Sequence, residues 1–194
     1  NGEPCIDTAE GARKKTICTS RSFGNMVGGL DSLKAAVATF AGSCANKLRG
    51  EGSGATSVTV FLCSNRFRDD LEQYGNAASA RLLTPTSDTM EITNAALSIL
   101  ARIFRKGIMY KKAGVIVGDF VSISPLQANL FDPIANRQQR ARLMRAMDEL
   151  NHRYGLKTLR LAVEGEDKQP WKVRCEHRSP NYLTNINEIL TIRV

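Results

Sequence analysis

Apolar residues recur along this chain at two different spacings, and each spacing predicts a different element. From residue 30 to residue 48 they fall three or four positions apart, the period of an amphipathic helix: Leu30, Leu33, Val37, Phe40, Ala41, Cys44 and Leu48. Asp31 suits the positive end of such a helix, and Gly50 and Gly52 end it. On this stripe Cys44 is expected to be a small buried hydrophobe.

A second helix is predicted over the residues that follow position 86. Its buried stripe is expected to consist of Ile92, Ala96, Ile99 and Ile103. Possible N-caps precede the stripe at Thr86, Ser87, Asp88 and Thr89. Gly107 lies where this helix must have ended.

Four segments have the alternation or β-branched content of strands: residues 15–23, 57–64, 77–84 and 110–119. The predicted order is therefore strand, helix, strand, strand, helix, strand. This order predicts an α+β fold with a mixed or antiparallel four-stranded sheet and both helices on one face. The other face of the sheet is left free to contact a partner.

The chain changes character after residue 120. Residues 121–136 lack periodicity and contain Pro125 and Pro133, which is typical of a linker. Residues 137–194 predict a small α+β C-terminal unit. It would contain a helix marked by Leu143, Met147 and Leu150, followed by a hairpin with strands at 158–163 and 171–175.

Composition favours an anionic partner. The 194 residues include 27 Lys plus Arg against 19 Asp plus Glu, a net charge of +8. Nucleic acid is the leading candidate and a membrane surface the second. No apolar run approaches the roughly 20 residues of a membrane span, and no signal peptide is visible. Because the chain begins at Asn1, we expect it to be cut from a longer protein.

The cysteines and histidines predict neither a metal site nor a disulfide framework. Five cysteines lie far apart, and His152 and His177 stand alone. This usage fits a reducing, cytoplasmic environment.

No active site is predicted from the acidic residues. The adjacent pair Asp69 and Asp70 lies in a loop beside Arg66 and Arg68, so local ion pairs are the preferred interpretation over a two-metal site. A second acidic group is expected at the tip of the predicted hairpin, where such residues are ordinary: Glu164, Glu166 and Asp167. The glycines of residues 50–54 lack the lysine of a phosphate-binding loop.

The basic residues form two groups without intervening acids. One surrounds the first strand (Arg13, Lys14, Lys15 and Arg21), and the other runs from the second helix into the fourth strand (Arg102, Arg105, Lys106, Lys111 and Lys112). In this topology the outer segments of the sequence commonly become neighbours, so we expect the groups to merge into one phosphate-binding surface. Because aromatic residues are sparse here, duplex backbone contact is favoured over single-strand stacking.

The linker contains the segment Gln127-Ala-Asn-Leu-Phe131. An extended peptide of this kind offers two adjacent apolar anchors, Leu130 and Phe131, and one amide that both donates and accepts hydrogen bonds. Its form, Q-x-x-L-F, resembles the peptide by which bacterial DNA polymerases and repair proteins bind the sliding clamp. The alternative is that the Leu-Phe pair packs on its own domain.

Longer stretches of the chain resemble one family in order. Residues 13–24 (RKKTICTSRSFG) and 110–120 (YKKAGVIVGDF) are similar to the opening and closing strands of the little-finger domain of UmuC-type Y-family translesion DNA polymerases. Residues 2–5 resemble the tether from the thumb, and residues 142–151, Trp171 and residues 179–182 resemble the family's C-terminal extension. The implied domains are a tether at 1–12, a little finger at 13–120, a linker with a clamp-binding peptide at 121–136 and a small domain at 137–194.

The resemblance implies a non-catalytic fragment of a DNA-directed DNA polymerase that acts in the SOS response. The catalytic palm and its Mg²⁺ would lie upstream, and no cofactor is implied for this fragment. By position, the resemblance assigns contacts with duplex template-primer DNA to Lys14, Thr16, Thr19, Lys111 and Lys112. The two basic groups add Lys15, Arg21, Arg102, Arg105 and Lys106 to the predicted DNA-binding residues. Gln127, Leu130 and Phe131 would bind the bacterial sliding clamp.

Three questions stay open at this point. Strand alternation prevents Thr16 and Thr19, or Lys111 and Lys112, from facing the same way without a bulge. Residues 137–194 would bind a RecA filament, a UmuD-type accessory subunit or nothing. The rival interpretations of the whole chain are a free-standing basic adaptor that binds DNA or RNA and, more remotely, a nuclease or transferase that depends on Asp69 or Asp70.

Overall fold

The computed structural model describes residues 14–122, 132, 134, 136–166, 169–173, 179–182 and 185. The elements follow the predicted order: β1 (Thr16–Val27), α1 (Leu30–Gly50), β2 (Ser53–Ser64), β3 (Gly75–Thr86), α2 (Thr89–Ile103) and β4 (Tyr110–Ser122). They are followed by α3 (Arg137–Tyr154) and a single 3-10 turn at Ala162–Glu164.

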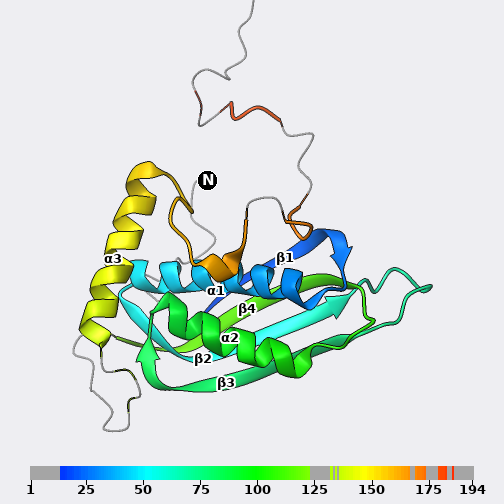
Figure 1. The fold of residues 1–194 in the computed structure, drawn as a ribbon, viewed down its shortest axis with the longest axis horizontal. Helices are drawn as coiled ribbons and strands as arrows, with labels where there is room; N and C mark the ends of the chain where they lie inside the picture. Colours follow the sequence, from blue (N-terminus) through cyan, green and yellow to red (C-terminus); the bar gives the residue numbers. More distant parts are fainter. Residues whose placement is uncertain are drawn as a thin grey trace, which may run out of the picture.

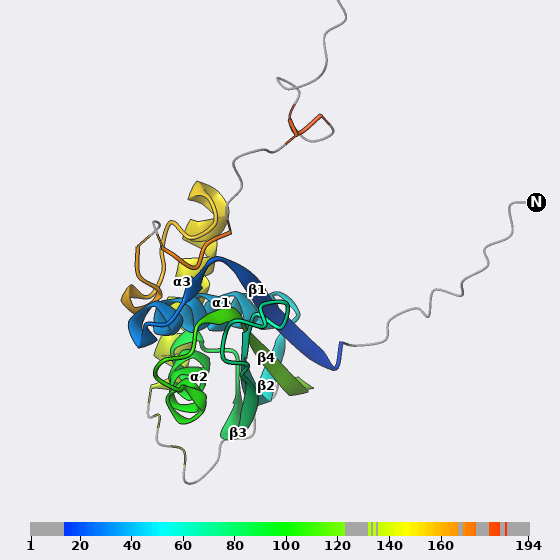
Figure 2. The ribbon, with the colours of Figure 1, turned by 90° about the vertical axis from the view of Figure 1, so that its right-hand side faces the viewer.

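The four strands form one antiparallel sheet in the order β1-β4-β2-β3. Helices α1 and α2 lie side by side on one face of this sheet, as Figures 1 and 2 show. The predicted α+β class, strand order along the chain and single helix layer are therefore confirmed.

The core lies between the sheet and its two helices. Strands contribute Val58, Val60, Leu62, Val115 and Val117, all with no exposed surface. Helix α1 contributes Leu33, Val37, Phe40, Cys44 and Leu48, and α2 contributes Ile92, Ala96, Ile99 and Ile103. The apolar spacing of three and four residues that predicted both helices is thus the stripe that each buries.

Helix α2 begins at one of its four predicted caps. The Asp88 carboxylate accepts hydrogen bonds from the backbone N–H groups of Met90 (2.7 Å) and Glu91 (3.3 Å). These bonds satisfy two of the donors that every helix leaves unpaired at its start. Helix α1 has no such side-chain cap at Gly29, so its start depends on packing of its long apolar face.

The predicted C-terminal hairpin is wrong. Residues 158–163 do not form a strand, and Ala162–Glu164 instead form the 3-10 turn. Residues 171–173, the described part of the second predicted strand, are not in a strand either. Trp171 is buried and its ring packs edge-on against Phe40 of α1 with the centroids 5.5 Å apart. Packing of this aromatic residue onto α1 therefore outweighs the short alternation of apolar and polar residues.

Glu164 is also not at an exposed tip. It is 8% exposed, and its carboxylate accepts a hydrogen bond from the N–H of Leu161 at 3.2 Å. A Cβ on Gly42 of α1 would lie 3.2 Å from the Glu164 Oε1, so the missing side chain at Gly42 admits this carboxylate. Burial raises the pKa of Glu164.

Candidate nucleic-acid interface

The sheet face opposite the helices carries rows of paired residues, many of which are small. Gly118 of β4 lies between Thr16 of β1 and Ser57 of β2. The next rows along the sheet are Cys18–Ile116–Thr59 and Ser20–Gly114–Phe61. We call this surface, formed by alternate residues of the four strands, the open face.

At two glycines of β4, side chains of the neighbouring strands lie close to where a Cβ would be. A Cβ on Gly114 would lie 2.4 Å from Cζ of Phe61 and 2.6 Å from Cβ of Ser20, so the Phe61 ring covers β4 where a side chain would stand. A Cβ on Gly118 would lie 3.1 Å from Oγ of Ser57. These contacts explain why glycine occupies both positions of a central strand, where it is otherwise unfavourable.

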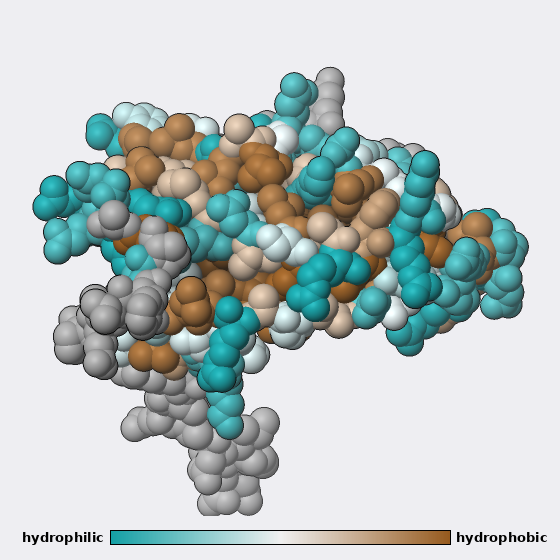
Figure 3. All heavy atoms as spheres, turned by 60° about the horizontal axis from the view of Figure 1, so that its bottom comes forward, coloured by the Kyte–Doolittle hydropathy of each residue, from teal (hydrophilic) through white to brown (hydrophobic). Residues whose placement is uncertain are grey.

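Cations border the open face at both ends. Lys112 is opposite Ser22 and Cys63, and its Nζ is 5.9 Å from the centroid of the Phe61 ring. Arg81 of β3 is opposite Ser57, in the row that contains Thr16 and Gly118. Arg81 was not among the predicted contacts because it is a single cation between uncharged residues, and only the strand register brings it to this face. The edge strand β3 lies on the side turned forward in Figure 3, where hydrophobic and hydrophilic residues are interspersed.

The predicted merging of the two basic groups is half right. Strands β1 and β4 are neighbours, but they run antiparallel, so Thr16 pairs with Gly118 and Ser22 pairs with Lys112. Lys15 is seven residues from Ser22, the partner of Lys112, so Lys14 and Lys15 lie at least about 23 Å along the strand from Lys112 and further from Lys111. The groups bound one sheet at opposite ends and do not form a single patch.

Thr19 and Arg21 do not share the open face with Thr16. Thr19 faces the helices, is 9% exposed, and accepts a hydrogen bond from Sγ of buried Cys44 at 3.3 Å. Arg21 has the same parity as Thr19 and pairs with fully buried Ala113, although its own side chain is exposed. Of these three residues, regular alternation places only Thr16 on the open face. The expected bulge lies further along β1, between Ser22 and Val27.

The remaining predicted cations lie on or next to the outer strand β1, on β4, and around the end of α2. Lys111 donates a hydrogen bond from Nζ to the carbonyl of Phe23 at 2.6 Å, whereas Lys112 is exposed. Lys14 pairs with Glu51 at 2.5 Å, and Lys15 is exposed. Arg102, Arg105 and Lys106 are exposed at the end of α2 and in the connection to β4. The Arg105 guanidinium lies 4.9 Å from the centroid of the Tyr74 ring.

The predicted clamp-binding residues Gln127, Leu130 and Phe131 lie outside the described residues. Asp132, which follows them, is described. Its carboxylate is held by the Arg137 guanidinium and accepts a hydrogen bond from Oγ1 of Thr84 at 3.4 Å. Through these contacts Asp132 is tied to α3 and to β3.

The acidic loop pair has the expected local partner. Asp70 accepts two hydrogen bonds of 2.6 Å from the guanidinium of Arg68, which lowers the pKa of that exposed carboxyl. Across the residues that the structure describes, no group of three or more His, Cys, Asp and Glu side chains could hold a metal ion. Within the same residues no helix combines the length and hydrophobicity needed to cross a membrane.

Comparison with known proteins identifies the family. The family model described as the impB/mucB/samB family C-terminal domain matches residues 14–130, and one described as a domain of unknown function matches residues 141–192. The chain therefore belongs to the impB/mucB/samB family, and the resemblance to UmuC-type proteins is confirmed.

The relatives extend this similarity over nearly the whole chain. Protein UmuC of Salmonella typhimurium (strain LT2) is 40% identical over 193 residues, which are 99% of this chain and 46% of that protein. Protein SamB of Salmonella typhimurium is 37% identical over 190 residues, 97% of this chain and 44% of that protein. The chain spans about half the length of these curated relatives.

Two solved structures resemble the fold at low identity. One is an insertion ternary complex of Dbh DNA polymerase, with a TM-score of 0.45, 9% identity, and coverage of 55% of this chain and 28% of that chain. The other is a complex of the β-clamp processivity factor with the little finger domain of PolIV, with a TM-score of 0.40, 11% identity, and coverage of 62% and 97%. These scores are too low to bear on function.

Proposed function

We propose that this chain is the non-catalytic C-terminal region of a translesion DNA polymerase, acting in DNA repair in the cytoplasm. In this proposal the open face holds the sugar-phosphate backbone of duplex template-primer DNA, and Gln127–Phe131 recruits the enzyme to the sliding clamp. The catalytic carboxylates and their Mg²⁺ belong to a part of the polymerase outside this sequence. Membership of the impB/mucB/samB family supports the proposal.

The observation that carries the proposal is the open face itself. Its central row of Ser20, Gly114 and Phe61 is uncharged, while Lys112 and Arg81 stand at its borders. Hydrogen-bonding hydroxyls and two border cations suit phosphate oxygens and carry no base-reading pattern. Contact with the backbone alone is what a polymerase crossing damaged template requires.

The DNA-binding part is tested by charge-removing substitutions on the open face. Lys112→Gln and Arg81→Gln should each weaken binding to a labelled duplex in fluorescence anisotropy. Each should also reduce the slope of log affinity against log salt by about one, because one phosphate contact is lost. Lys34→Gln, which removes the same charge from α1 in the helix layer, is the matched control and should bind like wild type.

Two outcomes would contradict this part. Equal loss in Lys34→Gln and Lys112→Gln would mean that only net charge matters. A loss in Lys112→Gln that depends on duplex sequence would indicate base readout instead of backbone contact.

The clamp-binding part is tested separately. The double substitution Leu130→Ala/Phe131→Ala should abolish binding of the chain to a purified bacterial sliding clamp while leaving duplex affinity unchanged. Undiminished clamp binding would refute the peptide assignment. Failure of the wild-type chain to bind the clamp would favour a free-standing basic adaptor. Binding of residues 137–194 to a RecA filament or a UmuD-type subunit stays a prediction.

A further inference from the structure

Helix α3 is attached to the rest of the protein in an unusual way. It buries one of its 18 residues, Met144, whereas α2 buries seven of 15. A cavity of about 650 Å³ lies along the attachment, lined by residues of α1, β3, α2 and α3. Apolar burial, the main stabilising term in most helix contacts, is therefore small here.

Ion pairs between arginine and carboxylate side chains attach α3 to the rest of the protein instead. Arg140 donates two hydrogen bonds to the Asp88 carboxylate at 2.7 and 3.0 Å. Asp148 accepts two from the Arg49 guanidinium at 2.6 and 2.8 Å. Both pairs are bidentate, the strongest geometry for arginine with a carboxylate. Burial works to raise the pKa of Asp148, but the Arg49 hydrogen bonds and charge outweigh it and lower that pKa.

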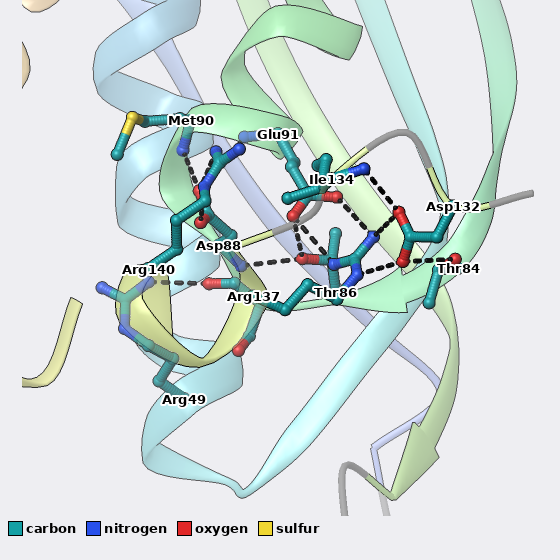
Figure 4. Close-up of polar contacts among 11 residues, drawn as sticks. Arg49, Thr84, Thr86, Asp88, Met90, Glu91, Asp132, Ile134, Arg137 and Arg140 are labelled. Carbon is teal, nitrogen blue, oxygen red and sulfur yellow. Dashed lines mark hydrogen bonds and ion pairs between the residues drawn. The ribbon is translucent and has the colours of Figure 1, made fainter. Parts of the chain in front are cut away.

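A third arginine connects α3 to the chain segment before it. Arg137 lies between Glu91 and Asp132, as Figure 4 shows. It donates to Glu91 at 3.0 Å and to Asp132 at 2.9 Å. Because Asp132 also accepts a hydrogen bond from Thr84 of β3, these contacts join Asp132 to the sheet and to α3 together.

We propose that these three arginine sites form a latch, and that α3 undocks from the helix layer as a unit while the sheet and its two helices stay folded. We use latch for the pairs Arg140–Asp88, Arg49–Asp148 and Arg137 with Glu91 and Asp132. This inference goes beyond the proposed function and does not depend on it.

Hydrogen exchange of the whole 194-residue chain, followed by mass spectrometry, tests the latch. Arg140→Gln and Asp88→Asn each remove one charge of the same pair, and asparagine keeps the N-cap of α2. Either substitution should speed exchange of the α3 amides by roughly tenfold, equivalent to about 1.4 kcal/mol. The sheet amides should exchange as in wild type, which also demonstrates that the variants fold.

Arg142→Gln is the matched control. Arg142 is exposed on the same helix, two positions from Arg140 and so about 200° around it. Its removal should leave α3 exchange unchanged. The double variant Arg140→Gln/Asp88→Asn should exchange no faster than either single one, because both remove the same interaction. Raising the sodium chloride concentration should reduce the difference in α3 exchange rate between wild type and the single variants.

Two results would overturn the proposal. In one, α3 and the sheet exchange at the same rate in wild type and in every variant, which would make α3 part of the cooperative core. In the other, Arg142→Gln accelerates α3 exchange as much as Arg140→Gln, which would mean that helix charge and not the latch controls docking.

Discussion

Gly114 makes the sharpest test of how the open face is built. A methyl group at this position would lie 2.4 and 2.5 Å from two ring carbons of Phe61 and 2.6 Å from Cβ of Ser20. Cβ of Ser20 is fixed to the backbone of β1, so it cannot move away without disturbing the pairing of β1 with β4, and the Phe61 ring can yield only by turning out of its present position. Gly114→Ala should therefore destabilise the fold.

The expected magnitude follows from two opposing effects. Forcing one extra carbon into a closely packed position typically costs about 1–3 kcal/mol. Alanine is better than glycine in a strand by roughly 0.5–1 kcal/mol. The net loss of unfolding free energy should thus lie between about 0 and 2.5 kcal/mol, with a central value of about 1 kcal/mol.

Urea unfolding followed by circular dichroism measures this loss, with two glycines of the same sheet as controls. Gly75→Ala meets no atom within 4 Å and should be neutral or stabilising by about 0.5 kcal/mol. Gly118→Ala would meet the Ser57 hydroxyl at 3.1 Å, a side-chain end that can rotate, and should stay within about 0.5 kcal/mol of wild type.

One result would refute the packing of the Phe61 ring over Gly114. If Gly114→Ala unfolds at the same urea concentration as Gly75→Ala, the Phe61 ring does not occupy the space over Gly114. Adding Phe61→Ala to Gly114→Ala should give a favourable coupling of at least about 0.5 kcal/mol, because the ring part of the clash is removed. Additive effects would contradict the packing just described.

Three further predictions concern single side chains. Thr16→Val should weaken duplex binding measured by anisotropy, whereas Thr19→Val should not, because the Thr19 hydroxyl is directed at Cys44; equal effects would contradict the facing of β1. Asp88→Ala should lower the thermal midpoint more than Asp88→Asn, since only asparagine retains the cap, worth about 1 kcal/mol; equal midpoints in calorimetry would remove the cap from the argument. The Arg137 hydrogen bonds lower the pKa of Asp132 from 3.8 to about 2, so its stabilising contribution is present above about pH 4 and is lost as the pH falls toward 2; Arg137→Gln should abolish this part of the acid-unfolding profile, and an unchanged profile would refute it.

Regular periodicity made the helix layer predictable. The stripes of α1 and α2 and the N-cap at Asp88 all follow from local rules that tertiary packing reinforces. The strands were predicted for the same reason, although each proved longer than its apolar alternation. Periodicity carries no information on family membership, so the family could be predicted only from the resemblance of longer stretches of sequence.

The site was less predictable because it depends on register. Whether Lys14 lies near Lys112 is decided by the antiparallel pairing of β1 with β4, which no local pattern encodes. Arg81 reaches the open face through its pairing with Ser57, a residue 24 positions away in the sequence. The predicted hairpin failed because the contact of Trp171 with Phe40 joins distant segments of the chain.

In the proposed complex with duplex DNA, the antiparallel pairing of β1 with β4 also sets the duplex length that reaches both ends of the sheet. The lysines at its two ends are separated by at least about 23 Å along the strands. Duplex DNA rises about 3.4 Å per base pair, so a duplex aligned with these strands needs about seven base pairs to reach both ends. Affinity should therefore rise with duplex length up to about that footprint, and a shorter duplex would reach the cations of only one end at a time.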